Sequence, residues 1–184
     1  MKNEAVHRIE YRRLEPSDLQ PGLLDRFERH QEVKRVWRDI DGELTLIDNP
    51  FNEDWNEAEK DSLVQKYFPE TIASGGCVFA AFYKGDVIAF AALRAQPLGS
   101  RGQYRQLVSL HVSFGYRELG IGTHLFRMCA DEARACGANK LYISGHSAEE
   151  TQAFYKAMGC VPAEEIDRAQ QEREPCDIQL EFAL

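Results

Sequence analysis

The sequence predicts an α/β (α+β) fold in which helices cover the faces of a mixed β-sheet. Two patterns point to this class: strand and hairpin signals crowd the first half of the chain, and strands alternate with helices in the second half. The hydrophobic fraction of 43% is enough for one buried core. The 184 residues show no internal repeat, low-complexity stretch or linker, so a single domain over residues 1–184 is expected.

Local patterns assign the N-terminal elements. Alternation of apolar and charged side chains over 6–14 predicts a strand, and leucine spacing over 16–29 predicts a helix. Residues 33–46 have the pattern of a hairpin, because an Asp-Gly dipeptide in the middle tolerates the positive φ of a tight turn. The polar composition of 48–55 predicts a loop after the hairpin.

A second helix is predicted from Asn56 onward. Asn56 has the position of an N-cap, and Glu59, three residues later, would complete a capping box. Pro69 is expected to kink this helix or to end it early, and Gly75-Gly76 end it at the latest.

The second half of the chain alternates strands and helices. The strand-helix-strand unit from 106 to 144 implies a parallel pair of strands joined by a right-handed crossover. The predicted strands are 77–83, 87–93, 106–112, 140–144 and 177–183, and the predicted helices are 122–135 and 147–158.

Charge, hydropathy and cysteine content argue against several classes of function. A net charge of −8 disfavours nonspecific nucleic-acid binding, which needs cationic side chains, and is compatible with a cationic amine substrate. No apolar run approaches the roughly 18 residues of a membrane span, and no apolar stretch follows the first four residues as in a secretory signal. The five cysteines lack a CxxC pair, so reduced thiols in a cytoplasmic protein are expected, and no metal site is predicted.

A glycine turn separates the predicted strand 106–112 from the helix 122–135. Gly120 and Gly122 remove two β-carbons where the backbone must turn, so the N–H groups that begin the helix can point at one anion. A pyrophosphate suits this position, and Arg117 at its rim would add a charge-assisted contact. The segment has neither the Gly-Lys-Ser/Thr of a P-loop nor the third glycine of a dinucleotide fingerprint. The simplest alternative is a plain glycine-rich turn that opens a helix.

Residues 117–122 resemble motif A of the GNAT acetyltransferases, in which Arg or Gln is followed by two residues, Gly, one residue, and Gly or Ala. This chain supplies Arg117, Gly120 and Gly122 in register. Residues 153–160 resemble the Phe-Tyr…Gly-Phe segment of the same family. Two motifs at the proper separation make the resemblance more specific than either motif alone.

The resemblance implies a mainly antiparallel, twisted sheet whose parallel strand pair splays apart in the middle, where acetyl-CoA binds. Two positions depart from the family pattern. Cys160 stands where Phe is usual, and the Asn that often contacts CoA is missing, which leaves Ser147 as the nearest polar candidate. The residues implied to contact acetyl-CoA are Leu110, His111, Val112, Arg117, Glu118, Leu119, Gly120, Ile121, Gly122, Thr123, Ser147 and Tyr155.

The resemblance also implies a reaction, in which a primary amine of a small molecule or peptide attacks the thioester of acetyl-CoA directly within a ternary complex. Val112 would donate its N–H to the thioester oxygen, and Tyr155 would protonate the leaving thiolate as general acid. From the residues alone, Tyr155 is better explained as a member of a helix stripe with Phe154 and Met158.

The base that deprotonates the amine is left open. His111 has a suitable ordinary pKa, but strand alternation turns it away from its neighbours in the strand, as expected for a sheet histidine. Glu53 and Asp54 are the other candidates for the base, and a water chain to solvent would also suffice. With Trp55 they could hold an ammonium group by charge and cation–π contact, or they belong to a solvated loop. The first helices and residues 97–103 would complete the acceptor pocket.

Two main function classes remain, beside a nucleotide-binding domain unrelated to CoA. The first is a catalytic N-acetyltransferase. The alternative is a noncatalytic acyl-CoA-binding or sensing module on the same fold, which would bind acetyl-CoA through Gly120 and Gly122 and form no product. Exposed strand edges would also allow a homodimer.

Overall fold

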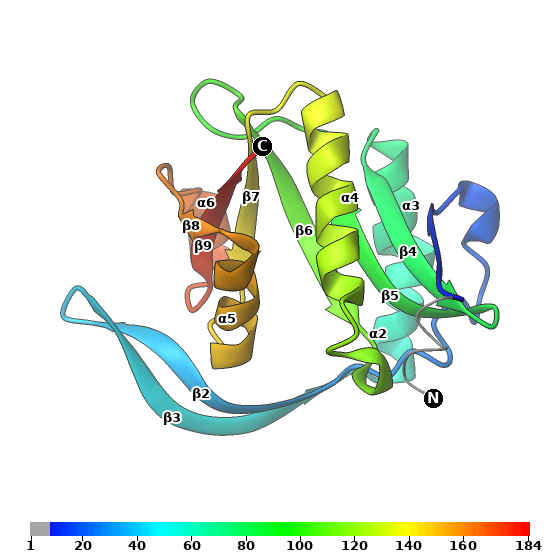
Figure 1. The fold of residues 1–184 in the computed structure, drawn as a ribbon, viewed down its shortest axis with the longest axis horizontal. Coiled ribbons are helices and arrows are strands. Elements are labelled where there is room, and N and C mark those ends of the chain that lie inside the picture. The colour runs from blue at the N-terminus through cyan, green and yellow to red at the C-terminus, as the bar shows by residue number, and fades with distance from the viewer. Residues whose placement is uncertain (1–7) are drawn as a thin grey trace.

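A mixed β-sheet organises the molecule (Figure 1). The computed structural model describes residues 8–184. Within these residues, seven strands form the sheet in the order β1-β4-β5-β6-β7-β9-β8, with β6–β7 parallel and the other neighbours antiparallel. The fold class predicted from the sequence is therefore confirmed. The strands are β1 (Glu10–Arg13), β4 (Cys77–Tyr83), β5 (Asp86–Leu93), β6 (Tyr104–Val112), β7 (Lys140–Gly145), β8 (Val161–Pro162) and β9 (Ile178–Ala183).

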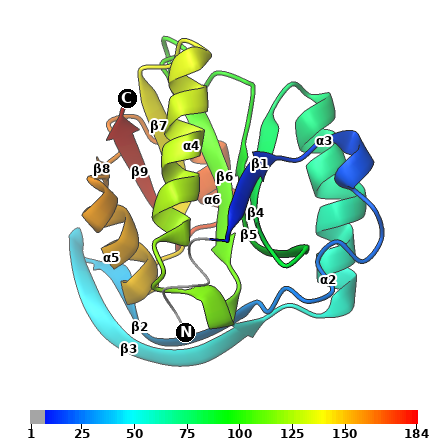
Figure 2. The same cartoon turned by 45° about the vertical axis from the view of Figure 1, so that its right-hand side comes forward.

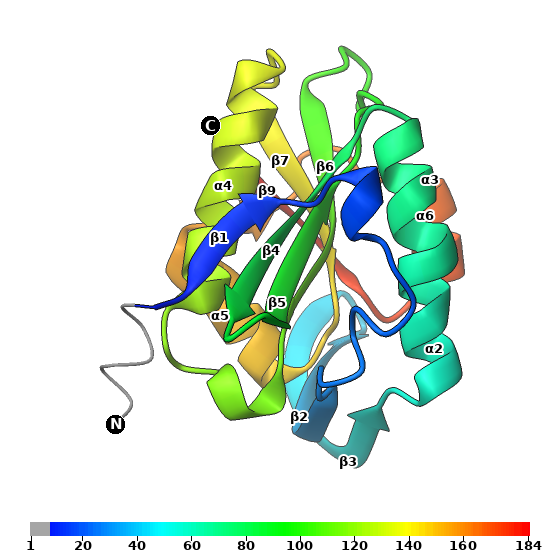
Figure 3. The same cartoon turned by 90° about the vertical axis from the view of Figure 1, so that its right-hand side faces the viewer.

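Helices cover both faces of this sheet (Figure 3). One face carries α4 and α5, and the other carries α2, α3 and α6. Each face has its own apolar core, with Leu125 and Phe126 on the α4 side and Phe68 and Phe90 on the α3 side. In the part of the chain that the structure describes, no helix is both long and apolar enough to span a bilayer. The helices are α2 (Glu57–Ser62), α3 (Phe68–Ala73), α4 (Ile121–Ala135), α5 (Glu149–Met158) and α6 (Arg168–Arg173).

A long curved hairpin, β2 (His30–Ile40) and β3 (Glu43–Asp54), lies outside the main sheet. It starts near α2 and passes beneath the sheet toward α5 (Figure 2). On that far side Val36 bridges Ala148, just after the end of β7. At the near side Phe114, just after the end of β6, donates its N–H to the carbonyl of Glu28 at 2.9 Å. The hairpin therefore connects the carboxyl ends of β6 and β7.

The loop expected at 48–55 is wrong, because residues 43–54 form the second strand of this hairpin. The composition misleads because the strand is largely exposed and carries polar side chains. A register shift between Val33 and Arg35 of β2 leaves Pro50 outside the ladder pairing, which a proline in a strand requires.

The helix expected at 16–29 is also wrong. The structure has a single 3₁₀ turn, η1 (Pro16–Asp18), followed by irregular turns. Gly22 adopts a left-handed φ of 86°, which is incompatible with a continuing helix. Leu24 and Phe27 are nevertheless buried, so their spacing reflects packing onto the sheet and not a helix.

Smaller differences concern element ends. The strand expected at 6–14 is present as β1, whereas Val6 and His7 lie outside the described residues. The helix expected at 147–158 begins two residues later, at Glu149. Neither β8 nor α6 was predicted, because both are too short to show a period.

Pro69 does not end the second helix. The predicted capping box is present, since Glu59 donates its N–H to Asn56 Oδ1 at 3.0 Å and accepts from the Asn56 N–H at 2.8 Å. Before the proline, a π-helical turn, η2 (Leu63–Tyr67), widens the helix so that Phe68 donates to the Leu63 carbonyl. This wider turn accommodates a residue that lacks an N–H and crowds the preceding turn.

A bulge in β6 creates the feature on which the site depends. Tyr104–Leu107 pair with Lys140–Ile143 of β7, and no further pairs follow. On the other side of β6, the register with β5 shifts at the same point, so that Val108 has no partner. Because a bulge bends and twists its strand, β6 leaves β7 here. We call the space between Val108–Val112 and the end of β7 the interstrand gap.

Candidate functional site

The backbone of β6 presents hydrogen-bonding groups to the interstrand gap. Ser113 donates its N–H to the Ile88 carbonyl of β5 at 2.8 Å. Because backbone groups alternate sides along an antiparallel strand, those of Leu110 and Val112 point away from β5 and into the gap. Arg117 reaches the Val112 carbonyl from that side, with Nε 3.3 Å from the oxygen. The Val112 and Leu110 N–H groups are thus directed where β7 would otherwise pair.

The glycine turn lies at the mouth of the gap. Glu118 and Gly120 have left-handed φ angles of 64° and 77°, and α4 begins at Ile121. Two left-handed residues just before a helix turn the chain so that the first N–H groups of the helix face one point. The side chain of Ile121 is buried in the core, so only its backbone N–H is available to a ligand. This arrangement fits a diphosphate.

Gly122 faces the same space without a side chain. A Cβ at this position would lie 3.5 Å from Val112 and from Phe154, and 3.6 Å from Leu110, which is ordinary contact. The bare Cα therefore stands between β6 and α5 and leaves room for an extended ligand. Together with the N–H groups, this bare surface fits the diphosphate and pantetheine of acyl-CoA.

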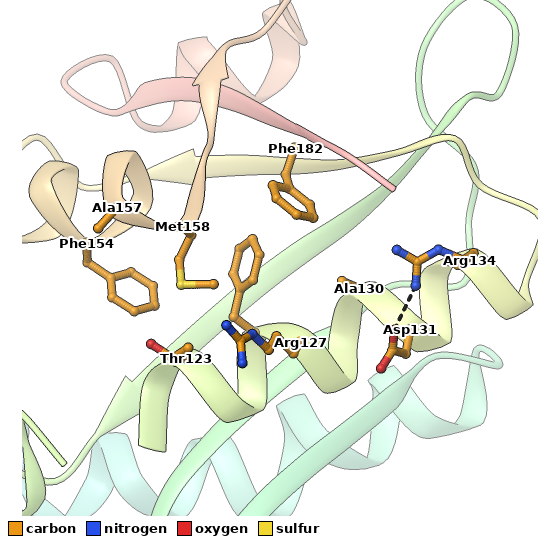
Figure 4. Close-up of a pocket in the computed structure, with 10 residues that line it drawn as sticks. Thr123, Arg127, Ala130, Asp131, Arg134, Phe154, Ala157, Met158 and Phe182 are labelled. Carbon is orange, nitrogen blue, oxygen red and sulfur yellow. Dashed lines mark hydrogen bonds and ion pairs between the residues drawn. The ribbon is translucent and has the colours of Figure 1, made fainter. Parts of the chain in front are cut away.

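A groove of about 390 Å³ continues from the turn between α4 and α5 (Figure 4). Thr123 and the exposed Arg127 border it on α4, while Phe154 and Met158 border it on α5. Arg134 lies farther along α4, held by Asp131 at 2.7 Å. A long ligand that starts in the gap can thus extend along a surface that offers aromatic and cationic contacts.

Tyr155 stands at the closed side of the gap. Its side chain is 7% exposed, and its ring packs against Gly145, where a Cβ would be only 3.2 Å from the ring. Burial raises the pKa of Tyr155 well above its ordinary value. The phenol therefore stays protonated at neutral pH. Tyr155 both packs in the α5 stripe and lies at the end of β7, so the two sequence interpretations are compatible.

Ser147 is engaged by the hairpin. It is 1% exposed, its hydroxyl accepts a hydrogen bond from Arg38, and its carbonyl accepts the Trp37 N–H at 2.8 Å. Ser147 therefore anchors β2 in this structure, and its contact with acetyl-CoA stays a prediction.

His111 lies on the face opposite Val112, as strand alternation predicts. Its ring packs against Trp55 and Phe90, with centroids 4.7 and 5.3 Å away. Burial, aided by the positive charges of Arg29 and Arg117, lowers the pKa of His111 to about 3. A neutral imidazole of such low basicity is a poor proton acceptor for an ammonium group.

This depressed pKa predicts a specific acid sensitivity. The unfolded chain binds a proton at His111 near pH 6.5, whereas the folded chain does not until about pH 3, so stability falls as the pH drops through this window. Thermal unfolding between about pH 6.5 and 4.5 measures the effect, above the range in which most carboxylates titrate. His111→Phe is expected to flatten the curve, whereas replacing the exposed His124 by Gln should leave it unchanged. If the melting temperature of His111→Phe fell with pH as steeply as that of the native chain, the lowered pKa of His111 would be contradicted.

The three predicted acceptor residues separate in the structure. Glu53 and Trp55 face the His111 side of the gap, where Glu53 Oε2 is 2.5 Å from Arg29 Nη2. Asp54 lies on the opposite side of β3, is 61% exposed and contacts His30 at 2.6 Å. Strand alternation explains this division. Asp54 is therefore not part of the site.

Several polar side chains on this face were not singled out by sequence reasoning. Ser144 on β7 donates to Asp177 at 3.0 Å, and burial raises the pKa of Asp177. His146 accepts the Ala148 N–H at Nδ1 and lies 3.4 Å from Glu53 through Nε2. No local pattern marks these residues, because three chain segments bring them together.

Residues 97–103 do not belong to the acceptor side. They precede β6 and so lie at the end of that strand opposite Val112. Gln103 there donates to Glu165 at 2.7 Å. Among residues 8–184, no group of three or more His, Cys, Asp or Glu side chains is placed to hold a metal ion.

Comparison with known proteins identifies a family whose model matches most of the chain. The model described as "Acetyltransferase (GNAT) family" matches residues 34–160. No curated protein matches the chain. The matched region contains both the glycine turn and Tyr155.

Similar solved structures share the whole fold. A nourseothricin acetyltransferase has a TM-score of 0.70 at 16% identity, covering 96% of this chain and 98% of its own. A protein of Bacillus anthracis str. Ames assigned as a streptothricin acetyltransferase, in complex with acetyl coenzyme A, has a TM-score of 0.69 at 18% identity, covering 96% and 98%. PaiA N-acetyltransferase of Thermoplasma acidophilum, in complex with coenzyme A, has a TM-score of 0.59 at 15% identity, covering 96% and 99%. At these identities the similarity establishes the fold.

Proposed function

The chain belongs to the GNAT family of acetyltransferases, whose acetyl donor is acetyl-CoA, and on this basis we propose that it acetylates a primary amine of a small molecule or peptide by direct attack in a ternary complex. The observation that carries the proposal is the interstrand gap, into which Leu110 and Val112 direct their backbone groups beside the glycine turn.

The donor half of the site has a role for each group. The N–H groups of Ile121, Gly122 and Thr123 bind the diphosphate at the start of α4. Arg117 and the backbone of Glu118, Leu119 and Gly120 border it. Leu110 and Val112 pair with the amides of the pantetheine arm, as β7 would pair with a regular strand. His111 contributes its backbone only, because its ring lies on the other face.

Two residues serve the chemical step. Acetyl-CoA supplies an activated acetyl group. The Val112 N–H donates to the thioester oxygen as negative charge develops there, an effect worth about 3 kcal/mol for a preorganised donor. Tyr155 donates its phenolic proton to the departing sulfur, for which a neutral phenol at pH 7 is suited.

The amine loses its proton on the His111 side of the gap. Glu53 is the candidate base that the structure favours over Asp54 and His111, since its carboxylate faces the gap and His111 is too weakly basic. Trp55 forms a wall of the same pocket through its contacts with Phe90 and His111.

A thiol-release assay tests the function. Purified protein with acetyl-CoA is expected to release CoA thiol only when a suitable amine is added, and mass spectrometry should show the acetylated amine. Polyamines, aminoglycosides, amino acids and peptide N-termini form the panel; streptothricin-type compounds are added because similar structures carry that name.

The same assay separates the noncatalytic alternative. A sensing module on this fold would bind acetyl-CoA in calorimetry but release no thiol with any amine. The buried, protonated Tyr155 beside Gly145 favours catalysis, because a sensor has no need of a proton donor near the thioester.

A further inference from the structure

The guanidinium of Arg29 is buried and only partly satisfied. Its side chain is 8% exposed, and Nη2 binds Glu53 at 2.5 Å. Among the residues that the structure describes, no group accepts a hydrogen bond from Nε or Nη1, and both atoms are closed to solvent. Arginine remains charged at any physiological pH, and unmet donors on a buried cation are costly. The arrangement therefore calls for an acceptor that is not part of the chain.

Arg29 lies close to the carboxyl end of β6, at the candidate site. The preceding residue, Glu28, donates its N–H to Ser113 Oγ at 3.0 Å, which ties this segment to the end of β6. Trp55 stacks over the guanidinium at 5.7 Å and also contacts His111. Stacking covers the flat face of the guanidinium and leaves its edge N–H groups unmet.

The surroundings add positive charge on the β6 side. Ser109 lies two residues before His111 on the same face of β6, and its buried hydroxyl is turned to the phenol of Tyr67. The charge of Arg117 also reaches this region, since Arg117 and Arg29 each lower the pKa of His111. Glu53 is the carboxylate in direct contact with Arg29.

A second carboxylate lies on the other side of the gap. Asp177 is held there by Ser144 on β7, while Glu53 lies between the two sides, in contact with Arg29 and 3.4 Å from His146. An acceptor that spans the gap thus meets the cation of Arg29 toward β6 and the carboxyl group of Asp177 toward β7. This polarity suits a molecule with an anionic group at one end and an amine at the other.

We propose that the acceptor carries a carboxylate in addition to its amine, as in an amino acid, and that Arg29 binds this carboxylate. The inference rests on the proposed acetyl transfer. Charge-assisted hydrogen bonds to a carboxylate would complete the donors of Arg29. Glu53 then orients Arg29 on one edge while the acceptor occupies the others.

Because the free nitrogens are closed to solvent, an acceptor reaches them only when Trp55 or Glu53 shifts. Trp55 is one of two tryptophans in the chain, so its emission can be isolated by Trp37→Phe. In that background, adding a carboxylate-bearing acceptor to protein saturated with CoA is expected to change Trp55 fluorescence. The decarboxylated amine at the same concentration should leave it unchanged.

Matched substrate pairs test the specificity directly. Lysine against cadaverine, ornithine against putrescine and tyrosine against tyramine differ only in the carboxylate. The carboxylate-bearing member of at least one pair is expected to have about tenfold or higher kcat/KM, the ratio that one lost charged hydrogen bond produces. Arg29→Gln should raise its KM about tenfold or more and leave the KM for acetyl-CoA unchanged, with Arg29→Lys intermediate.

Arg26→Gln is the matched control, since Arg26 is 80% exposed and three residues away. Higher activity with the decarboxylated member of every pair, no change in Trp55 emission, or equal KM values in Arg29→Gln would overturn the inference. If Arg29→Gln does not fold, the inference is tested by the substrate pairs with the native chain and by Trp55 fluorescence in the Trp37→Phe variant. Thiol release with polyamines alone defeats this inference and leaves acetyl transfer standing, whereas no thiol release with any amine defeats the proposed function.

Discussion

Replacing Gly122 with leucine is expected to weaken acetyl-CoA binding about 100-fold or more while the protein stays folded. A Cβ at this position meets Val112 and Phe154 at 3.5 Å, so the protein tolerates it, and the rest of the side chain must extend into the space between β6 and α5. Displacing the diphosphate removes at least two charge-assisted hydrogen bonds of about 1.5–3 kcal/mol each. Leucine is favoured over glycine inside a helix by about 1 kcal/mol, so stability should not fall.

Calorimetry with acetyl-CoA and thermal unfolding measure the two effects. Gly122→Ala should lose much less affinity, because its methyl group makes only the ordinary contacts described above. Gly115→Ala is a control within the same turn, since a Cβ there meets nothing within 4 Å. Unchanged affinity in Gly122→Leu would remove the glycine turn from the binding site.

Replacing Tyr155 with phenylalanine is expected to lower kcat by about 10²–10⁴, the usual contribution of a general acid. Acetyl-CoA affinity should change little, because phenylalanine keeps the ring that packs against Gly145. The raised pKa of Tyr155 keeps its proton in place through neutral and mildly alkaline pH, so loss of activity with rising pH should begin above about pH 10.

Tyr104→Phe provides the matched control. Its hydroxyl is also buried and donates to Glu181 at 2.6 Å, but it lies at the start of β6, far along the strand from Val112. This variant should lose stability and keep its kcat. An unaltered rate in Tyr155→Phe, measured at saturating acetyl-CoA, would exclude the acid role.

Short-range signals in the sequence were predictive. The Asn56–Glu59 capping box and the Asp41-Gly42 turn are present in the structure, because each needs only backbone geometry and neighbouring residues. The glycine turn is local in the same sense. Gly120 has the left-handed φ that its position before α4 demands.

Sequence patterns gave the wrong secondary structure where tertiary contacts decide the conformation of a segment. Leu24 and Phe27 have helical spacing, but they pack from irregular turns that follow a left-handed glycine. The polar residues around Pro50 belong to a strand whose partner supplies the pairing. Composition does not reveal either structure, because each segment's conformation depends on the part of the fold against which it packs or pairs.

The sequence by itself determined the elements proposed to bind the donor: an α/β fold, a glycine turn at Gly120 and Gly122 that opens a helix, and Tyr155 within the second motif. These follow from contiguous residues with strict local geometry. Only the tertiary structure decided which residues are proposed to bind the acceptor. Arg29 and Glu53 reach the site because the hairpin joins the ends of β6 and β7. The bulge at Val108 opens the gap between those strands, and no periodic pattern in the sequence predicts this bulge.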